Sequence, residues 1–210
     1  MRRIPLSRRS HITGFQPQAT GLTEHESALE RDFVTLVRFA DAVARITSQP
    51  VTIEFQDQAR TRRYTPDFLV RWNGGEAELI EVKYQADLRR LGKQLRPRFM
   101  AARRWAREHG ASFRVATERS IRTPRLSNAQ RLLPLRNAWL DPDAALQVRV
   151  ALMSQAPATL GELLQVLPGE RATVLGTLWR MIARGALSVD LDVPITLGSP
   201  IGLPRGVTPL

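Results

Sequence analysis

Two carboxylates and one lysine stand at spacings that suit metal-assisted chemistry. Asp67 follows Pro66, while Glu81 and Lys83 lie two residues apart at the end of a run rich in apolar residues. Side chains two residues apart in a β-strand point to the same face, so Glu81 and Lys83 should emerge together. The intervening Asn-Gly-Gly at 73–75 has the turn chemistry of a β-hairpin. We therefore expect one hairpin to carry all three groups.

The length of the turn decides whether the two carboxylates meet. A three-residue loop at 73–75 places Asp67 opposite Glu81. A loop of two or four residues would instead place Asp67 opposite Ile80 or Val82. Only the three-residue loop gathers two carboxylates and a lysine on one patch.

Such a patch favours a bound divalent cation. Two neighbouring carboxylates repel, and each raises the pKa of the other unless a cation lies between them. Oxygen ligands suit Mg²⁺ or Mn²⁺, and a nearby ammonium can orient a water or stabilise charge on a phosphate. The set predicts metal-assisted phosphodiester hydrolysis. The alternative is a surface hairpin in which Lys83 forms a cross-strand salt bridge with Asp67 and Glu81. The spacing, the preceding Pro66 and the basic chain that follows favour the metal site.

The positive charge of the chain is concentrated directly after this hairpin. Residues 85–131 carry 13 Lys and Arg against 3 Asp and Glu, which gives +10 of the formal net charge of +11. A basic stripe beside a carboxylate pocket favours a polyanionic substrate, and nucleic acid is the preferred interpretation over a solvated helix surface.

The composition excludes several other classes of protein. The chain has no cysteine, which excludes disulfides and thiolate sites, and its three histidines lie too far apart to suggest a zinc site. No apolar run approaches a membrane span or a signal peptide. We expect a soluble, cytoplasmic protein that associates with DNA and does not contact membranes. Residues 1–22 read as a flexible basic arm.

Residues 23–130 are predicted to form an α/β domain. Thr23 and Glu26 resemble a capping box that opens a helix with buried Leu29, Phe33 and Val37. The spacing alone favours Glu30 as an edge residue of that helix. The remaining predicted elements are a first strand at 51–55, the hairpin, a helix at 86–95 and a strand at 112–117, which together form a small α/β sheet. Pro97 either interrupts the helix or starts a new one.

Residues 131–210 are predicted to form a smaller, mostly helical module. Asp141-Pro142 and Thr159 provide helix starts, and 187–191 could form one strand of a wing. The order of elements favours a winged-helix-like fold. Because residues 141–210 carry 5 basic against 6 acidic residues, we interpret this module as a protein-docking unit.

Several segments together resemble a known family. Thr65-Pro66-Asp67 with Glu81-Val82-Lys83 resembles the motif of the PD-(D/E)xK nucleases. With residues 26–33, Gln49-Pro50 and Phe113–Glu118 added, the chain resembles TnsA, the endonuclease subunit of heteromeric Tns-type transposases. The resemblance implies a restriction-endonuclease-like mixed sheet flanked by helices.

The resemblance also assigns roles to individual residues. It implies that Glu30 is the helix-borne acid of the site, contrary to its spacing. It implies Asp67 and Glu81 as ligands of Mg²⁺, which Mn²⁺ can replace, and Lys83 as the catalytic lysine. We also place Val82 in the metal site. Contacts to DNA are expected from Arg62, Arg63, Arg89, Arg90, Lys93 and Arg96.

The implied activity is cleavage of the 5′ strands at transposon ends in double-stranded DNA. The implied partners are a TnsB-like transposase, which cuts and joins the 3′ strands, and a TnsC-like AAA+ ATPase. A free-standing restriction or repair nuclease and a non-catalytic DNA-binding scaffold protein remain alternatives.

Overall fold

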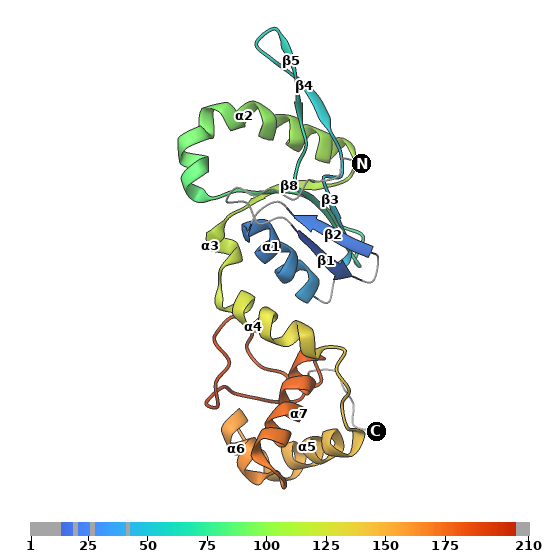
Figure 1. The fold of residues 1–210 in the computed structure, drawn as a ribbon, viewed down its shortest axis with the longest axis vertical. Helices are drawn as coiled ribbons and strands as arrows, with labels where there is room; N and C mark the ends of the chain where they lie inside the picture. Colours follow the sequence, from blue (N-terminus) through green and yellow to red (C-terminus); the bar gives the residue numbers. More distant parts are fainter. Residues whose placement is uncertain (1–13, 19–20, 26–27, 41–42, 205–210) are drawn as a thin grey trace. The chain divides into compact units, whose positions relative to one another are not determined.

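The chain folds as two compact units that divide after Arg122. The computed structural model describes residues 14–18, 21–25, 28–40 and 43–204, and at 14–18, 21–25 and 44 it describes the backbone alone. The division falls before α4 (Pro124–Leu132), which packs against α7 (Arg171–Ala183) of the second unit. Residues 123–130, which we predicted to end the first domain, therefore belong to the second unit. Figure 1 labels the elements of both.

The start of the first unit differs from the prediction. Strands β1 (Gly14–Gln18) and β2 (Gly21–His25) pair antiparallel within the predicted arm and its border, while residues 1–13 and 19–20 lie outside the described residues. Thr23 lies within β2 and pairs with Gln16 of β1, so it cannot be the N-cap of the helix. Helix α1 (Ala28–Phe39) begins later. The predicted partner in the capping box, Glu26, lies outside the described residues.

A four-stranded mixed sheet forms the centre of the first unit. Its strands are β3 (Val43–Ser48), β6 (Phe68–Trp72), β7 (Ala77–Val82) and β8 (Ser112–Ala116), in the order β3-β6-β7-β8. The pairs β3–β6 and β6–β7 are antiparallel, and β7–β8 is parallel. Parallel neighbours need a long crossover connection, which α2 (Gln85–Glu108) provides.

Helices cover the two faces of this sheet with separate apolar clusters. On one face, Phe33 of α1 stacks on Phe68 at 5.4 Å between ring centroids, and Ile80 and Val82 belong to the same cluster. On the other face, Leu79 packs with Ala102 and Ala106 of α2 and with Ile53 and Tyr64. The predicted mixed α/β sheet flanked by helices is confirmed.

Two elements beside the sheet were predicted differently. The strand expected at 51–55 is β4 (Ile53–Asp57), which pairs with β5 (Arg60–Tyr64) as a separate two-stranded hairpin. Helix α2 continues through Pro97 as a single helix. Proline removes the hydrogen bond to the carbonyl of Lys93, and because Lys93 is exposed, water can replace the missing donor.

Within its described residues, the regular elements of the second unit are helices, and the chain after α7 forms turns and isolated bridges. Besides α4 and α7 it contains a short 3₁₀ turn (Leu133–Leu135), α5 (Pro142–Gln155) and α6 (Leu160–Val166). Asp141 caps α5 and Thr159 caps α6, as predicted. The strand expected at 187–191 is not formed, since Ser188 makes only an isolated bridge with Gly202. A winged-helix fold therefore stays a prediction.

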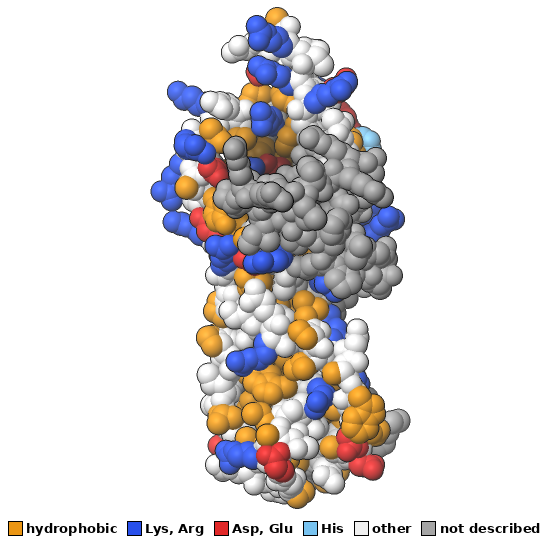
Figure 2. All heavy atoms as spheres, viewed as in Figure 1, with side chains coloured by type: hydrophobic (Ala, Val, Ile, Leu, Met, Phe, Trp, Pro, Cys, Tyr) orange, Lys and Arg blue, Asp and Glu red, His pale blue; other side chains and the backbone are white. Residues whose placement is uncertain are grey.

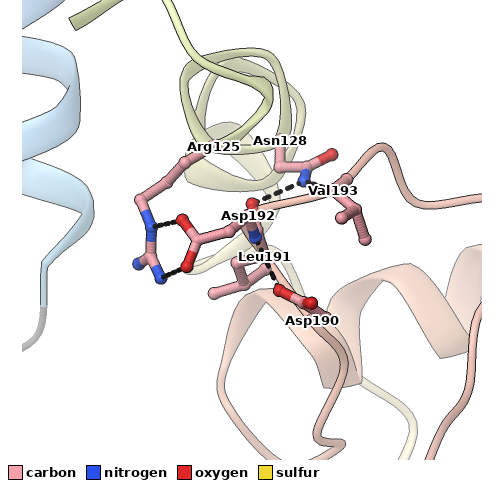
Figure 3. A network of polar contacts seen from close by, with 6 residues as sticks. All are labelled: Arg125, Asn128, Asp190, Leu191, Asp192 and Val193. Carbon is pink, nitrogen blue, oxygen red and sulfur yellow. Dashed lines mark hydrogen bonds and ion pairs between the residues drawn. The ribbon is translucent and has the colours of Figure 1, made fainter. Parts of the chain in front are cut away.

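A polar network ties α4 to the chain that follows α7 (Figure 3). The guanidinium of Arg125 binds both carboxylate oxygens of Asp192, with N···O distances of 2.6 and 3.0 Å. The buried Asn128 amide donates to the carbonyls of Leu191 and Val193 at 2.9 and 2.8 Å. These bonds order the segment in which a wing was expected. None of the described helices combines the length and apolar character needed to cross a bilayer.

Candidate active site

The turn between β6 and β7 sets the register that brings the site residues together. The strands pair Phe68 with Ile80 and Arg71 with Ala77, which is the register of the predicted three-residue loop. Gly75 takes φ +94° in this loop, a conformation that favours glycine. Continuing the register by one residue places Asp67 opposite Glu81, as the sequence predicts.

Asp67 directly precedes the central strand β6 and is held by contacts with both neighbouring strands, β3 and β7. Its carboxylate Oδ2 accepts the backbone N–H of Val82 at 2.7 Å. Its backbone carbonyl accepts the N–H of Gln49, directly after β3, also at 2.7 Å. The carboxylate of Asp67 therefore lies against the end of β7, next to Glu81.

Glu81 is the most deeply buried acid of the site, with 4% of its surface exposed. Its Oε2 accepts the phenol O–H of Tyr64 at 2.7 Å, and its Oε1 lies 3.3 Å from Nζ of Lys83. The backbone N–H of Lys83 donates to Ala116 and extends the parallel pairing with β8. The Glu81 carboxylate thus contacts two donors, Tyr64 at the end of β5 and Lys83 directly after β7.

Burial and neighbouring charges shift the pKa values of Asp67, Lys83 and Tyr64. Burial, followed by the charges of Glu81 and Glu30, raises the pKa of Asp67 well above its ordinary value. Burial alone would lower the pKa of Lys83, but the carboxylates of Glu81 and Asp67 outweigh it, so the pKa is raised. Burial and the Glu81 carboxylate raise the pKa of Tyr64. Lys83 and Tyr64 therefore stay protonated at neutral pH.

Glu30 lies in the first turn of α1, half-buried. Its negative charge contributes to the raised pKa values of Asp67 and Lys83, so the structure brings it within electrostatic reach of the hairpin. Val82 lies between Glu81 and Lys83, and its side chain packs in the core, so only its backbone can serve the site.

The donor set fits a hard divalent cation. Within the described part of the chain, no cluster of three or more Asp, Glu, His or Cys is arranged to hold a metal ion. Mg²⁺, however, usually keeps several waters and binds through one or two carboxylates, which Asp67 and Glu81 can supply. The unfavourable charge on Asp67 is what a cation would relieve.

The predicted DNA-contacting residues are exposed and fall on two elements. Arg62 and Arg63 lie on β5, where Arg62 approaches Asp57 at 3.7 Å and Arg63 binds Glu54 at 2.9 Å. Arg89, Arg90, Lys93 and Arg96 lie on α2, and Arg90 binds Asp87 at 2.8 Å. Figure 2 shows basic side chains around the β4–β5 hairpin and along α2.

Tyr64 is the site residue that the residue patterns alone did not single out. Its place next to Thr65-Pro66-Asp67 was visible, but its hydroxyl reaches Glu81 only because β5 ends beside β7 in the fold. Its role follows from geometry: it holds one oxygen of Glu81 and leaves the other toward Lys83.

Replacing Tyr64 with phenylalanine should weaken the protein and its site together. Loss of a buried hydrogen bond to a carboxylate should lower the free energy of unfolding by about 1–3 kcal/mol. Glu81 would lose the donor that orients it, so cleavage of DNA should also slow. Urea unfolding and a cleavage assay would measure the two effects. Unchanged stability would show that the hydroxyl does not hold Glu81.

The fold and the site together define a class of protein. A mixed sheet flanked by helices, with two coupled acids and a lysine at the ends of its central strands, is consistent with a nuclease-like fold. Residues 40–118 match the family model described as TnsA-like endonuclease N terminal. The predicted resemblance to TnsA is confirmed over this segment, which contains Asp67, Glu81 and Lys83. A search of curated proteins found no match to the chain.

Proposed function

We propose that the protein is the metal-dependent endonuclease subunit of a heteromeric Tns-type transposase and cleaves the 5′ strands at transposon ends. The observation that carries this proposal is the contact set of Glu81, which lies 3.3 Å from Lys83 and opposite Asp67. These residues lie inside the segment that matches a TnsA-like endonuclease. The match itself indicates a nuclease related to Tn7-type transposition, which acts on DNA.

The carboxylates of Asp67 and Glu81 would hold the metal, with Glu30 and the backbone of Val82 completing its surroundings. Bound Mg²⁺ or Mn²⁺ would polarise the scissile phosphate and lower the pKa of a coordinated water. The burial of Glu81 and the bond from Val82 to Asp67 keep the two acids in place without rearrangement.

Lys83 acts as a proton-bearing group in this proposal. In the metal-free protein the neighbouring carboxylates raise the pKa of Lys83, so the ammonium is charged at neutral pH and donates hydrogen bonds. The ammonium can orient the attacking water and stabilise the negative charge that grows on the phosphate oxygens. Tyr64 stays protonated for the same reason and holds Glu81.

The second unit is proposed to dock a TnsC-like ATPase, and a TnsB-like transposase is the other proposed partner of the protein. Along α5, Leu146, Val150 and Met153 expose 59%, 54% and 60% of their surfaces on one helix face. Exposed apolar stripes of this kind are typical of protein interaction sites. A winged-helix-like arrangement of this unit is part of the same proposal.

Cleavage of a labelled transposon-end duplex tests the proposal. The protein should cut the 5′ strand only when Mg²⁺ and the cognate transposase are both present, and a chelator should abolish the product. Cutting with Mg²⁺ alone would instead favour a free-standing restriction or repair nuclease. Binding without any metal-dependent cutting would favour a non-catalytic scaffold protein.

A further inference from the structure

A groove lies between the β4–β5 hairpin and α2, outside the proposed active site. Its volume is about 780 Å³, and one wall is formed by the end of β4 and the turn that follows it. The other wall carries five basic side chains of α2: Lys93, Arg96, Arg103, Arg104 and Arg107. The last three were not among the residues that we predicted to contact DNA.

The basic residues form one stripe along the helix. Lys93, Arg96, Arg103 and Arg107 follow one another at separations of three, seven and four residues, and Arg104 lies three residues before Arg107. At 3.6 residues per turn, all five fall within about 100° of the helix circumference, so they share a face. From Lys93 to Arg107 the stripe covers about 21 Å at 1.5 Å per residue. Duplex DNA carries one phosphate per strand for about each 3.4 Å of its axis, so the stripe can follow about six phosphates of one strand.

Little acidic charge offsets the stripe. Asp57 is the single acid among the residues that line the groove, and it lies 3.7 Å from Arg62. Arg104 approaches Glu108 at 3.7 Å, with both side chains largely exposed. Among the described residues, no ion pair involves Lys93, Arg96, Arg103 or Arg107. These cations are therefore available for an external polyanion.

The hairpin beside the groove has the form of a DNA-reading ribbon. It is two-stranded, and it turns at Gln58 and Ala59, which take φ of 54° and 35°. Strand β5 exposes Arg60, Arg62 and Arg63. In Figure 1 the hairpin extends past α2, away from the central sheet. The major groove of B-DNA admits a two-stranded ribbon of this kind.

We propose that this groove binds the flank of the DNA duplex, with α2 along one strand's backbone and the β4–β5 hairpin entering the major groove. The inference rests on the proposed function, since it takes DNA as the substrate. Helix α2 begins two residues after Lys83, and its basic stripe lies about 12 to 33 Å along the helix. The contact would therefore lie within about one helical turn of DNA from the cleaved bond.

Paired substitutions test the groove by binding alone. The full chain with Lys83→Ala, which prevents cleavage, serves as the parent, and a fluorescein-labelled 30-bp duplex is titrated between 50 and 200 mM salt. Adding Arg103→Ala and Arg107→Ala should lower the slope of log K against log salt by about 1.8, with affinity at 0.1 M reduced on the order of 50-fold. Fluorescence anisotropy measures both.

The matched control removes the same charge elsewhere. Adding Arg149→Ala and Arg171→Ala to the parent, both on the second unit, should leave the affinity and the salt slope unchanged. Equal loss in both double variants would mean attraction by net charge alone and overturn the proposal, as would an unaffected Arg103/Arg107 variant or a parent that does not bind the duplex. Failure of the intact protein to cleave end DNA would count against the nuclease function and leave the groove assignment standing.

Discussion

Replacing Lys83 with alanine is expected to abolish DNA cleavage while the protein stays folded. The ammonium lies 3.3 Å from Oε1 of Glu81 and keeps its charge at neutral pH. Among the described residues, no other side chain binds that oxygen. Losing a preorganised donor at a developing charge costs on the order of 10²- to 10³-fold in rate. Single-turnover cleavage of an end duplex, with partner transposase and Mg²⁺, would measure the loss.

The control for Lys83→Ala is Arg114→Ala. This substitution also removes one positive charge from the sheet. In the unaltered protein the guanidinium of Arg114 on β8 binds Glu78 on β7 at 3.2 Å. Because the ion pair between Arg114 and Glu78 is partly exposed and lies outside the candidate site, this variant should cut DNA at close to the normal rate. Circular dichroism would establish that both variants fold. Strand cutting by the Lys83 variant at the rate of the Arg114 variant would reject the assigned role of the lysine.

Replacing Asp67 with asparagine should abolish cleavage and make the metal-free protein more stable. The amide oxygen can still accept the N–H of Val82, but it removes a charge that burial, Glu81 and Glu30 all disfavour. Each pKa unit by which folding raises the pKa of an acid costs about 1.4 kcal/mol at high pH. Each 1 kcal/mol recovered should raise Tm by about 2–4 °C. Thermal melts without metal would measure the gain.

The pH dependence follows from the direction of the Asp67 shift. Because its pKa is higher in the folded than in the unfolded state, the folded protein binds the proton more tightly. Stability should therefore fall as pH rises from about 4, the unfolded value, through the folded pKa. The asparagine variant should lack this component of the fall.

Two comparisons test whether the effects of Asp67→Asn come from loss of a metal ligand at this position or from loss of any carboxylate. Mg²⁺ should raise the Tm of the unaltered protein but not that of the asparagine variant, since a cation that binds only the folded state stabilises it. Glu78→Gln makes the same change from carboxylate to amide at a partly exposed position of β7 and should alter neither cleavage nor the response to Mg²⁺. A metal response in the Asp67 variant equal to that of the unaltered protein would contradict the ligand assignment.

The geometry of the hairpin could be predicted from the sequence because its signals are local. The turn residues at 73–75 allow loops of two, three or four residues, and we predicted the three-residue loop because it alone gathers Asp67, Glu81 and Lys83; the structure has that register. Glu30 shows the limit of such signals. Its spacing on α1 suggested an edge residue, whereas packing of α1 on the sheet places its charge near Asp67.

The elements that sequence could not predict are those whose form depends on tertiary contacts. Strand β3 has an irregular register between Val43 and Arg45, which breaks the alternation that would reveal it. The β4–β5 turn uses Gln58 and Ala59 at positive φ, where glycine or asparagine would be the usual signal. In the second unit, Asn128 and Arg125 bind residues 191–193, at the end of the segment 187–191 that we predicted as a strand.

The turn between β6 and β7 has an evolutionary consequence. Strand side chains alternate with a period of two, so one codon gained or lost at 73–75 would shift β7 by a residue and send Glu81 to the opposite face. A substitution at Asn73 would leave the register of β7, and the face to which Glu81 points, unchanged. Descendants of this gene can therefore vary at Asn73, whereas Gly75 is held by its positive φ and an insertion or deletion in the turn removes the nuclease chemistry in a single step.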